Sequence, residues 1–414
     1  MTHPAWLHVI GIGEDGVEGL SEVAQALIAA AELVVGGRRH LLLVEGLMRG
    51  ERLMWPTSIS EGIERMLRWR GRRVVVLASG DPFSFGIGVT LCRYIPVGEM
   101  TCIPAPSSIT LACARMGWAR QDTTVLSICG RPMEVVAPAL QPGAHLIVLS
   151  ADGRSPVTLA KWMTARGFGP SVIHVLEALG GPYERHVHMR ADALAAGTAE
   201  GINPLNLMGI EVVAEPGAMV LPLSTGLPDD MFAHDGQITK REIRAATLSA
   251  LAPRQGEMLW DIGGGAGSIA IEWMLCHPAN RAVTIERNRE RTARIAHNAL
   301  TLGTPALRIV EGSALETLAA LHDRQTPRPD AVFVGGGIGN PGMMEGAWDA
   351  LRPGGRLVAN AVTLEGETAL LAAHARWGGS LSRLRVERVE QVGTQSAFRP
   401  AMTVTQYAAT RPAA

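Results

Sequence analysis

The chain has 414 residues, of which 47% are hydrophobic, and its formal net charge is −1 at pH 7. This length predicts two or three domains, each with enough apolar residues for a buried core. The near-zero charge argues against nonspecific nucleic-acid binding through an overall positive field, while a local basic patch stays open. No apolar run approaches the roughly 20 residues that a membrane-spanning helix needs, so we expect no membrane association.

The cysteines and the N-terminal residues indicate the compartment. The number of cysteines is odd and none forms a CxxC pair, which argues against a disulfide framework or a zinc site. The first residues, MTHPAWLHVIGIG, lack the basic region and cleavage site of a secretory signal. We therefore expect a reduced, cytoplasmic chain.

Short apolar segments alternate with segments at helical spacing along the whole chain. Strands are predicted at 6–13, 72–80, 145–150, 171–178, 205–213, 258–265, 282–287, 307–312, 331–337 and 355–362. A helix is predicted within 17–37, with Gly36 and Gly37 as its stop signal. Such alternation indicates βα units and mostly parallel sheets.

A segment rich in Pro, Gly and Ser, AEPGAMVLPLSTGLPDDMFAHDG, occupies residues 214–236. Its composition is typical of a linker. We therefore predict two domains, at 1–222 and 223–414, each large enough for its own core.

The first glycine turn, VIGIGEDG at residues 9–16, contains Gly11-x-Gly13-xx-Gly16. A lone GxGxxG is weak support for a dinucleotide site, and no acidic partner stands about 20 residues further on. Two later segments are more informative. A Gly-Asp-Pro turn directly follows a buried strand within 76–88, and PAPSSITLACARMGW at 104–118 places two hydroxyls at a helix start, where N–H groups are exposed.

Together, these three segments resemble the tetrapyrrole methylase family, and within it the member that methylates carbon 5 of precorrin-6B. The resemblance covers roughly residues 5–215 and implies two α/β lobes with S-adenosylmethionine bound between them. The cofactor-binding residues that it implies are Gly80, Asp81, Pro82, Phe85, Ser107, Ser108 and Ala178. The family often has GxGPG at the first turn, where this chain has Glu14 and Asp15 and no proline. For Asp81, a direct catalytic role and simple capping of the turn both stay open.

A second glycine loop lies in LWDIGGGAGSIAIEW, residues 259–273. A strand that turns tightly into a helix is a common nucleotide site, because backbone must approach the ligand closely. Ser268 occupies the third position of a dinucleotide fingerprint, which disfavours NAD, and Asp261 suits a ligand with an ammonium and a sulfonium group. Glu286, at the end of the next strand, can accept hydrogen bonds from ribose hydroxyls, and Ser313–Ala314 could hold an adenine edge.

The second half resembles the small S-adenosylmethionine-dependent precorrin methyltransferase/decarboxylase of corrin synthesis, over nearly all of 230–400. The segments that carry this resemblance are GQITKREIR (236–244), DIGGGAGSIAIEW (261–273), EGSALETL (311–318), FVGGGIG (333–339) and NAVTLE (360–365). The fold implied is a Rossmann-like class I methyltransferase fold. The cofactor-binding residues implied are Thr239, Gly263, Gly264, Gly265, Ala266, Gly267, Glu286 and Ala314. Where the motif often has Cys or Ser, this chain has Gly264, which we expect to loosen the loop.

The resemblance implies an α/β enzyme that methylates precorrin-6B at carbons 5 and 15 and removes the carboxyl group of the carbon-12 acetate, giving precorrin-8. The first domain would act on carbon 5, and the second on carbon 15 and the acetate. The reduced macrocycle supplies nucleophilic carbons, so the protein mainly aligns the reactants and we expect no metal in the reaction. The sequence identifies no catalytic acid or base.

A substrate with many carboxylates predicts Arg and Lys around the pockets. Candidate substrate-binding residues are Lys240, Arg241, Arg244 and Glu365, the last of which could instead cap a helix. The segment RHVHMR at 185–190 alternates as in an edge strand, and it could border the first cleft.

Other functions stay open at this stage. One is S-adenosylmethionine-dependent methylation of another tetrapyrrole. Another is an NAD-dependent oxidoreductase, disfavoured by Asp261 and Ser268. A third is a noncatalytic scaffold in which one domain has decayed. The family resemblance also implies a homo-oligomer, for which a tetramer is one candidate.

Overall fold

The computed structural model describes residues 5–321 and 326–413. The chain forms two compact units, one of Met1–Arg131 with Gln141–Met219 and the other of Pro132–Leu140 with Val220–Ala414. The sequence does not single out 132–140 as part of the second unit. The outer ends of the predicted domains, residues 1–4 and 414, lie outside the described residues.

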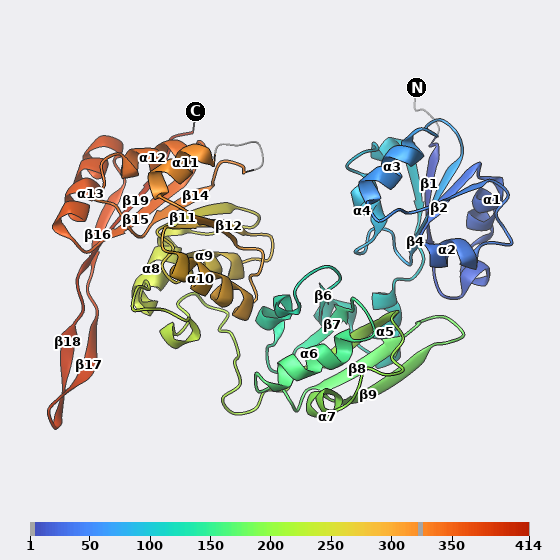
Figure 1. The fold of residues 1–414 in the computed structure, drawn as a ribbon, viewed down its shortest axis with the longest axis horizontal. Coiled ribbons are helices and arrows are strands. Elements are labelled where there is room, and N and C mark those ends of the chain that lie inside the picture. Colours follow the sequence, from blue (N-terminus) through green and yellow to red (C-terminus); the bar gives the residue numbers. More distant parts are fainter. Residues whose placement is uncertain (1–4, 322–325, 414) are drawn as a thin grey trace. The chain divides into compact units, whose positions relative to one another are not determined.

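The first lobe of the first unit is a parallel five-stranded sheet in the order β3-β2-β4-β1-β5. Its strands are β1 (Leu7–Ile12), β2 (Leu33–Gly36), β3 (Glu51–Met54), β4 (Val74–Ser79) and β5 (Met100–Ile103). Its helices are α1 (Glu22–Ala30), α2 (Arg38–Leu43), α3 (Ile59–Leu67) and α4 (Ile87–Leu91). Figure 1 shows α1 and α2 on one face of the sheet and α3 and α4 on the other.

The sequence of strand β4 is a continuous apolar run because the strand is buried on both faces of the sheet. Val74 and Val76 belong to a core cluster that includes Ile63 of α3, whereas Val75 and Leu77 belong to a cluster on the opposite face. A strand that is buried on both faces has no polar alternation.

The helix that we predicted within 17–37 is wrong in its second half. Helix α1 ends at Ala30, and Leu33–Gly36 is instead strand β2, buried between β3 and β4. The short run of Leu and two Val residues therefore takes the conformation that suits β-branched side chains in a sheet.

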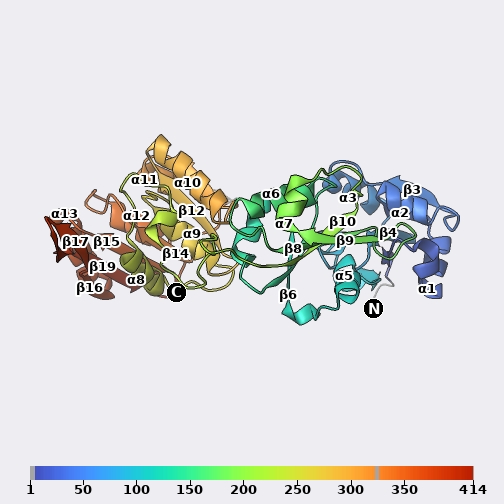
Figure 2. The same cartoon turned by 90° about the horizontal axis from the view of Figure 1, so that it is seen from below.

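The second lobe holds a mixed sheet in the order β6-β7-β10-β8-β9, in which only β6 and β7 pair in parallel. Its strands are β6 (Thr123–Ser127), β7 (His145–Leu149), β8 (Val172–Glu177), β9 (Arg185–Arg190) and β10 (Asn206–Glu211). Its helices are α5 (Ser108–Met116), α6 (Ser155–Thr164) and α7 (Ala191–Ala196). Figure 2 shows α5 on one side of this sheet and α6 and α7 on the other. The predicted edge strand at 185–190 is confirmed as β9.

The second unit is built on a seven-stranded sheet in the order β13-β12-β11-β14-β15-β19-β16, in which β19 runs antiparallel to the other six strands. Its strands are β11 (Met258–Ile262), β12 (Arg281–Glu286), β13 (Arg308–Glu311), β14 (Ala331–Val334), β15 (Arg356–Ala361), β16 (Ser380–Leu384) and β19 (Val404–Thr410). The strand order reverses between β11 and β14. Open α/β sheets bind their ligands at such a switch point, beyond the carboxyl ends of the strands.

Six helices cover the two faces of this sheet (Figure 1). They are α8 (Arg241–Leu251), α9 (Ser268–Leu275), α10 (Arg289–Thr301), α11 (Ala314–Ala320), α12 (Met343–Ala350) and α13 (Leu364–Trp377). Helices α11, α12 and α13 share one apolar core with the strands. Strands β17 (Glu387–Val392) and β18 (Gln395–Pro400) form a separate hairpin between β16 and β19. Over the described ranges, no helix is both long and apolar enough to cross a bilayer.

The fold class that we predicted is confirmed in both units. The first consists of two α/β lobes, and the second is a Rossmann-like doubly wound sheet. All ten predicted strand segments contain a strand.

Candidate functional site

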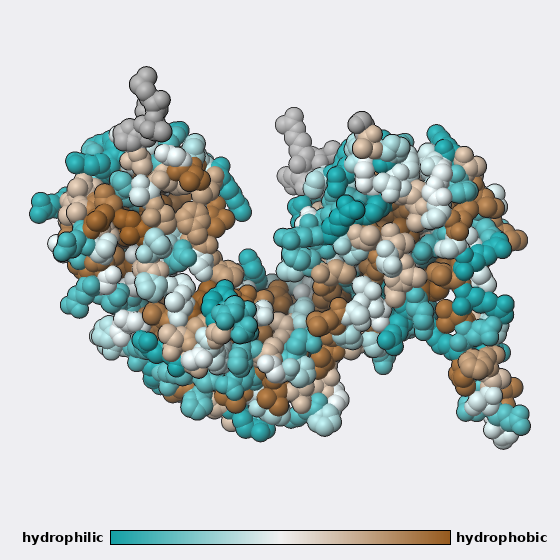
Figure 3. Space-filling model, turned by 180° about the vertical axis from the view of Figure 1, so that it is seen from behind, coloured by the Kyte–Doolittle hydropathy of each residue, from teal (hydrophilic) through white to brown (hydrophobic). Residues whose placement is uncertain are grey.

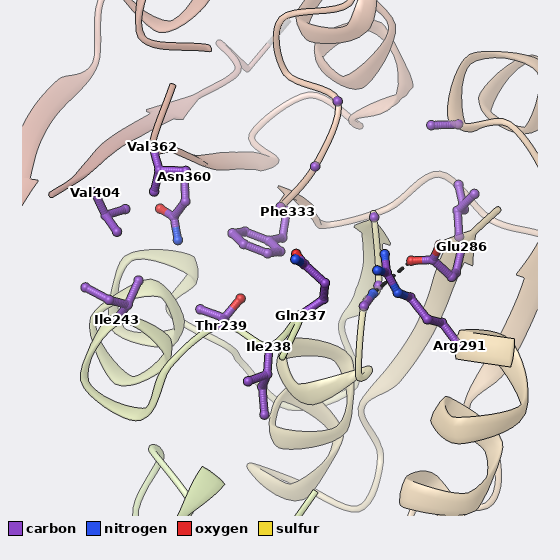
Figure 4. Close-up of a pocket in the computed structure, with 18 of the residues that line it drawn as sticks. Gln237, Ile238, Thr239, Ile243, Glu286, Arg291, Phe333, Asn360, Val362 and Val404 are labelled. Carbon is purple, nitrogen blue, oxygen red and sulfur yellow. Dashed lines mark hydrogen bonds between the residues drawn. The ribbon is translucent and has the colours of Figure 1, made fainter. Parts of the chain in front are cut away.

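A cavity of about 780 Å³ opens at the switch point of the second unit. Its wall includes the segments that follow β11, β12, β13 and β14, together with residues that precede α8. The lining residues that we predicted as ligands are Thr239, Lys240, Gly263, Gly264, Gly265, Glu286 and Ala314. Of the other predicted cofactor residues, Ala266 and Gly267 lie in the same loop but outside the wall. Figure 4 shows Thr239, Phe333 and Asn360 on one side of the cavity and Glu286 and Arg291 on the other.

The glycine loop brings two strand ends into direct contact. Gly265 has a φ of +58°, a conformation that a side chain strongly disfavours. A Cβ on Gly263 would lie 2.9 Å from the Gly336 nitrogen, so the loops after β11 and β14 touch through bare backbone. This close approach leaves the space above the loops for a ligand.

Gly264 fills a tighter position than we expected. A Cβ at this residue would lie 2.2 Å from Thr284 Oγ1 and 3.1 Å from Ile295 Cδ1. The expectation that a glycine here loosens the loop is therefore wrong, because the Thr284 hydroxyl occupies the place of the missing side chain.

Glu286 connects the loop to the cavity wall. Its Oε2 accepts a hydrogen bond from the Gly265 N–H at 3.0 Å, and its Oε1 accepts one from the Asn288 N–H at 2.9 Å. The side chain is nearly buried, at 5% exposure, yet it lines the cavity. Each carboxylate oxygen can accept a further bond, so this group is suited to a hydroxyl-bearing ligand.

Asp261 does not reach the cavity. It is fully buried beneath the loop, where Thr284 Oγ1 donates to its carboxylate at 3.3 Å. Burial raises the pKa of this carboxyl to about 7, against the smaller opposing effect of the Thr284 hydrogen bond. The idea that Asp261 meets the positive groups of a ligand directly is therefore wrong.

Arg244, which we predicted as a substrate contact, is fully buried and does not line the cavity. Its Nε donates to Glu272 Oε1 at 2.5 Å and its Nη1 to Asp229 Oδ1 at 3.0 Å. It also donates to the carbonyls of Leu227 and Thr239. Arg244 thus anchors the segment that carries Thr239, and we no longer propose it as a substrate contact.

Of the other three residues predicted to bind the substrate, one lines the cavity and two do not. Lys240 lines the cavity, with its Nζ 3.8 Å from Asp229 Oδ2. Arg241 lies outside the wall and donates from Nε to the Gly226 carbonyl at 3.0 Å. Glu365 also lies outside, in the first turn of α13, and the cap of that helix is Thr363, not Glu365.

Several polar residues of this cavity are not predicted from the sequence. Arg287, Arg291 and Arg388 join Lys240 as cationic groups in its wall. Asn360 donates to Thr247 Oγ1 at 2.8 Å, which holds its amide at the cavity. Arg287 directly follows Glu286, so its place at a strand end is the signal that could have found it.

The first unit has a cavity of about 450 Å³. The predicted residues in its wall are Gly80, Phe85, Ser107, Ser108 and Ala178. Asp81 and Pro82 lie next to the wall but outside it. Asp81 Oδ1 accepts a hydrogen bond from the Phe83 N–H at 2.8 Å, so this side chain caps the turn, as one of our two alternatives expects.

Two residues of this wall have unusual backbone conformations. Phe85 has a φ of +57° and Ala178 a φ of +45°. Among the residues that the structure describes, the one other non-glycine residue with positive φ is Ala252. Strained backbone of this kind gathers at ligand sites, where the surrounding structure holds it in place.

The first glycine turn also belongs to this cavity. A Cβ on Gly11 would lie 1.8 Å from the Gly80 carbonyl oxygen, so the turn needs glycine to meet the end of β4. Gly13 and Glu14 line the cavity, and Glu14 forms an ion pair with Arg39. Glu14, which stands where the family often has proline, therefore has Arg39 as its ion-pair partner.

Two polar side chains that the sequence does not single out, Arg39 and His40, lie beside the first glycine turn. Arg39 Nη2 donates to Ser79 Oγ at 2.8 Å, and His40 Nε2 lies 2.9 Å from the same oxygen. Burial and the neighbouring Arg39 lower the pKa of His40 to about 4, so its ring is neutral at pH 7. Its buried Nδ1 has no hydrogen-bond partner among the described residues, which leaves a polar atom for a ligand.

Comparison with known proteins gives matches in both units. A model of tetrapyrrole (corrin/porphyrin) methylases matches residues 6–195, and a model of the precorrin methyltransferase domain matches 230–411. The chain is 52% identical to a precorrin-6Y C(5,15)-methyltransferase [decarboxylating] from Sinorhizobium sp, over 98% of this chain and 96% of the relative.

Two further relatives are similar to part of the chain. A "Probable cobalt-precorrin-6B C(15)-methyltransferase (decarboxylating)" from Pyrobaculum calidifontis is 31% identical, over 46% of this chain and 100% of the relative. A cobalt-precorrin-7 C(5)-methyltransferase from Salmonella typhimurium is 29% identical, over 43% of this chain and 88% of the relative.

Proposed function

Because this chain belongs to the family of decarboxylating precorrin-6Y C(5,15)-methyltransferases, we propose that it methylates precorrin-6B (precorrin-6Y) at carbons 5 and 15. It also removes the carboxyl group of the carbon-12 acetate, and the product is precorrin-8. The methyl donor is S-adenosylmethionine. The observation that carries this proposal is the near-full-length similarity to a relative with both activities in its name.

The two reactions divide between the two units. The first unit methylates carbon 5, and the second methylates carbon 15 and decarboxylates. This division is supported by the two partial relatives, one named as a decarboxylating C(15)-methyltransferase and the other as a C(5)-methyltransferase, since each is similar to less than half of the chain. It is also supported by a cavity in each unit that is lined by predicted cofactor-binding residues.

In the second unit, the cofactor lies over the glycine loop. The bare backbone of Gly263–Gly265 allows close contact, and the Glu286 carboxylate accepts hydrogen bonds from the ribose. Thr239 and Ala314 border the same space. The residues present fit the cofactor, because each of these groups already faces one cavity.

In the first unit, the cofactor occupies the cavity beside Gly80, Phe85, Ser107, Ser108 and Ala178. The unpartnered His40 Nδ1 and the strained backbone of Ala178 both support a ligand there. Asp81 acts through the backbone turn that it caps, and we do not assign it a catalytic role.

When bound, S-adenosylmethionine supplies an activated methyl group. The protein then has to hold the macrocycle carbon in line with that group, which is a task of proximity and orientation. In the second unit Lys240, Arg287, Arg291 and Arg388 line the cavity, where they can pair with the carboxylates of the substrate. For Lys240, Arg291 and Arg388, this pairing competes with the ion pairs that they form with Asp229, Asp235 and Glu242. Loss of the carbon-12 carboxyl group as carbon dioxide leaves an electron pair that a protonated ring imine of the macrocycle can accept. A carboxylate that is unpaired and poorly solvated is released more readily.

Two variants of the full chain test this division. At S-adenosylmethionine concentrations below saturation, we expect Glu286→Gln to slow carbon-15 methylation and carbon dioxide release at least about tenfold and to leave carbon-5 methylation unchanged, because it weakens the cofactor site of the second unit. Conversely, Ala178→Leu, which fills the first cavity, should retain carbon dioxide release and lose the carbon-5 methyl group. Mass spectrometry of the product and trapping of carbon dioxide measure both outcomes. Carbon dioxide release that survives in Glu286→Gln and disappears in Ala178→Leu would contradict the assignment.

We also propose that the chain is a homo-oligomer, with a tetramer as the candidate assembly. The β17–β18 hairpin supports an interface, because all residues of β18 are exposed and apolar ones stand among them (Figure 3). Val389, Val392 and Phe398 are 58%, 60% and 71% exposed. Light scattering after size-exclusion chromatography measures the mass, and Phe398→Ser should shift it toward the monomer.

The cytoplasm is the compartment that we propose. The cysteines are Cys92, Cys102, Cys113, Cys129 and Cys276, and none of them is paired. Free thiols persist in a reducing compartment.

A further inference from the structure

Three histidines meet on the last two strands of the sheet in the second lobe. His174 lies on β8, and His186 and His188 lie on β9. One nitrogen atom from each residue lies within 4.8 Å of the other two. His174 and His188 are direct cross-strand partners, and cross-strand partners point to the same face of a sheet. The strand register therefore assembles this cluster.

The hydrogen bonds of His174 orient its ring for a further ligand. Its Nε2 lies 3.2 Å from Glu211 Oε1, and its Nδ1 lies 2.9 Å from His186 Nε2. The carboxylate accepts the proton on Nε2, which leaves the lone pair of Nδ1 directed toward His186. Histidines that bind metals almost always donate their other N–H to such a carboxylate or carbonyl. The cluster therefore has three candidate ligand nitrogens and, in Glu211, a carboxylate that holds the ring of His174 in place.

The surroundings leave the cluster accessible from solvent. The Trp118 ring packs edge-on against that of His174, with the ring centroids 5.7 Å apart. His186 and His188 are exposed, so an ion can reach the cluster from solvent.

We propose that His174, His186 and His188 bind one divalent transition-metal ion of the kind that prefers imidazole, such as Zn²⁺ or Cu²⁺. Glu211 is a positioning residue that acts through His174. The ion connects edge strand β9 to β8 and so holds both ends of the segment 178–184, which begins with the cavity residue Ala178. This site supports the wall of the first cavity and takes no part in methyl transfer.

The test uses the full-length chain without a histidine tag, titrated with Zn²⁺ in a calorimeter. We expect one strong site per chain. His186→Ala and His188→Ala should each weaken binding at least about tenfold, and Glu211→Gln by about 10- to 100-fold. The matched control is His374→Ala, which removes an exposed histidine of α13 and should leave binding unchanged.

A second readout identifies the ligands. With Cu²⁺ in place of Zn²⁺, electron paramagnetic resonance should show nitrogen hyperfine splitting that is lost in the His186→Ala/His188→Ala double variant. Zn²⁺ should also raise the unfolding midpoint of the native protein and not that of the double variant. The proposal is overturned if no Zn²⁺ binds, or if the double variant binds it as tightly as the native protein does.

Discussion

The carboxylate of Glu286 and the backbone amide of Gly265 are joined by a 3.0 Å hydrogen bond, which ties the end of β12 to the glycine loop after β11. In Glu286→Gln, the single amide oxygen can accept a hydrogen bond from the N–H of Gly265 or of Asn288, but not from both. The amide NH₂ group then faces the other N–H, which loses its acceptor. We expect Glu286→Gln to lower the S-adenosylmethionine affinity of the second unit at least about tenfold. Calorimetry measures this, with the exposed Glu290→Gln as control, and equal losses in both variants would contradict it.

The contact between Gly264 and Thr284 predicts a rescue. Gly264→Ser should destabilise the second unit by about 1–3 kcal/mol, because its new side chain meets Thr284 Oγ1. Adding Thr284→Ala removes that oxygen and should recover part of the loss. Thermal unfolding of the two single variants and the double variant gives the coupling between the sites. Strictly additive effects would show that the two residues do not compete for the same space.

Removing the charge of Arg244 should unfold the segment that it anchors. Arg244→Met leaves the Glu272 carboxylate buried and unpaired, so we expect a loss of about 3–5 kcal/mol in the free energy of unfolding. Arg241→Met, one turn of helix away in sequence and exposed, is the control and should cost much less. A small loss in Arg244→Met would mean that water replaces the guanidinium.

The raised pKa of Asp261 makes stability depend on pH. The folded protein holds this proton more tightly than the unfolded chain, so the contribution is complete below the ordinary pKa of 3.8 and is lost as the pH rises through about 7. Asp261→Asn cannot ionise. Relative to the native protein, it should therefore gain about 2 kcal/mol between pH 5 and pH 8. Urea unfolding across this range measures the difference, and a difference independent of pH would contradict the pKa.

The two serines at the start of α5 should behave differently. Ser107 is the cap, with its Oγ accepting from the Thr110 N–H at 3.2 Å. Ser107→Ala should lower the stability of the first unit by about 1 kcal/mol. Ser108→Ala should leave stability within about 0.5 kcal/mol and lower the cofactor affinity of the first unit, because Ser108 lines the cavity and does not cap the helix. Thermal unfolding and calorimetry separate the two effects.

The features that the sequence predicts well depend on residues close together in the chain. The strand β11, the glycine loop and helix α9 follow one another directly, so the apolar run, the glycines and the helical spacing define them locally. Glu286 is found for a similar reason, because it ends an apolar strand. The cofactor role of these residues stays a prediction.

The features that the sequence misses depend on partners far away in the chain. Arg244 looks like any basic residue at a helix start until Glu272 and Asp229 are placed beside it. Asp261 reads as a ligand because its neighbours are glycines, but its position inside a central strand buries it. Likewise, His174 and His188 lie on different strands, and strand register alone makes them partners.

Strand β19 follows the other strands of its sheet in chain order, yet it lies between β15 and β16. During synthesis on the ribosome, both neighbours emerge before the strand that joins them. Until β19 arrives, each of them presents an unpaired edge that could associate with another chain. Because Val404, the first residue of β19, also lines the cavity, the cavity wall of the nascent second unit is complete only after this last pairing step.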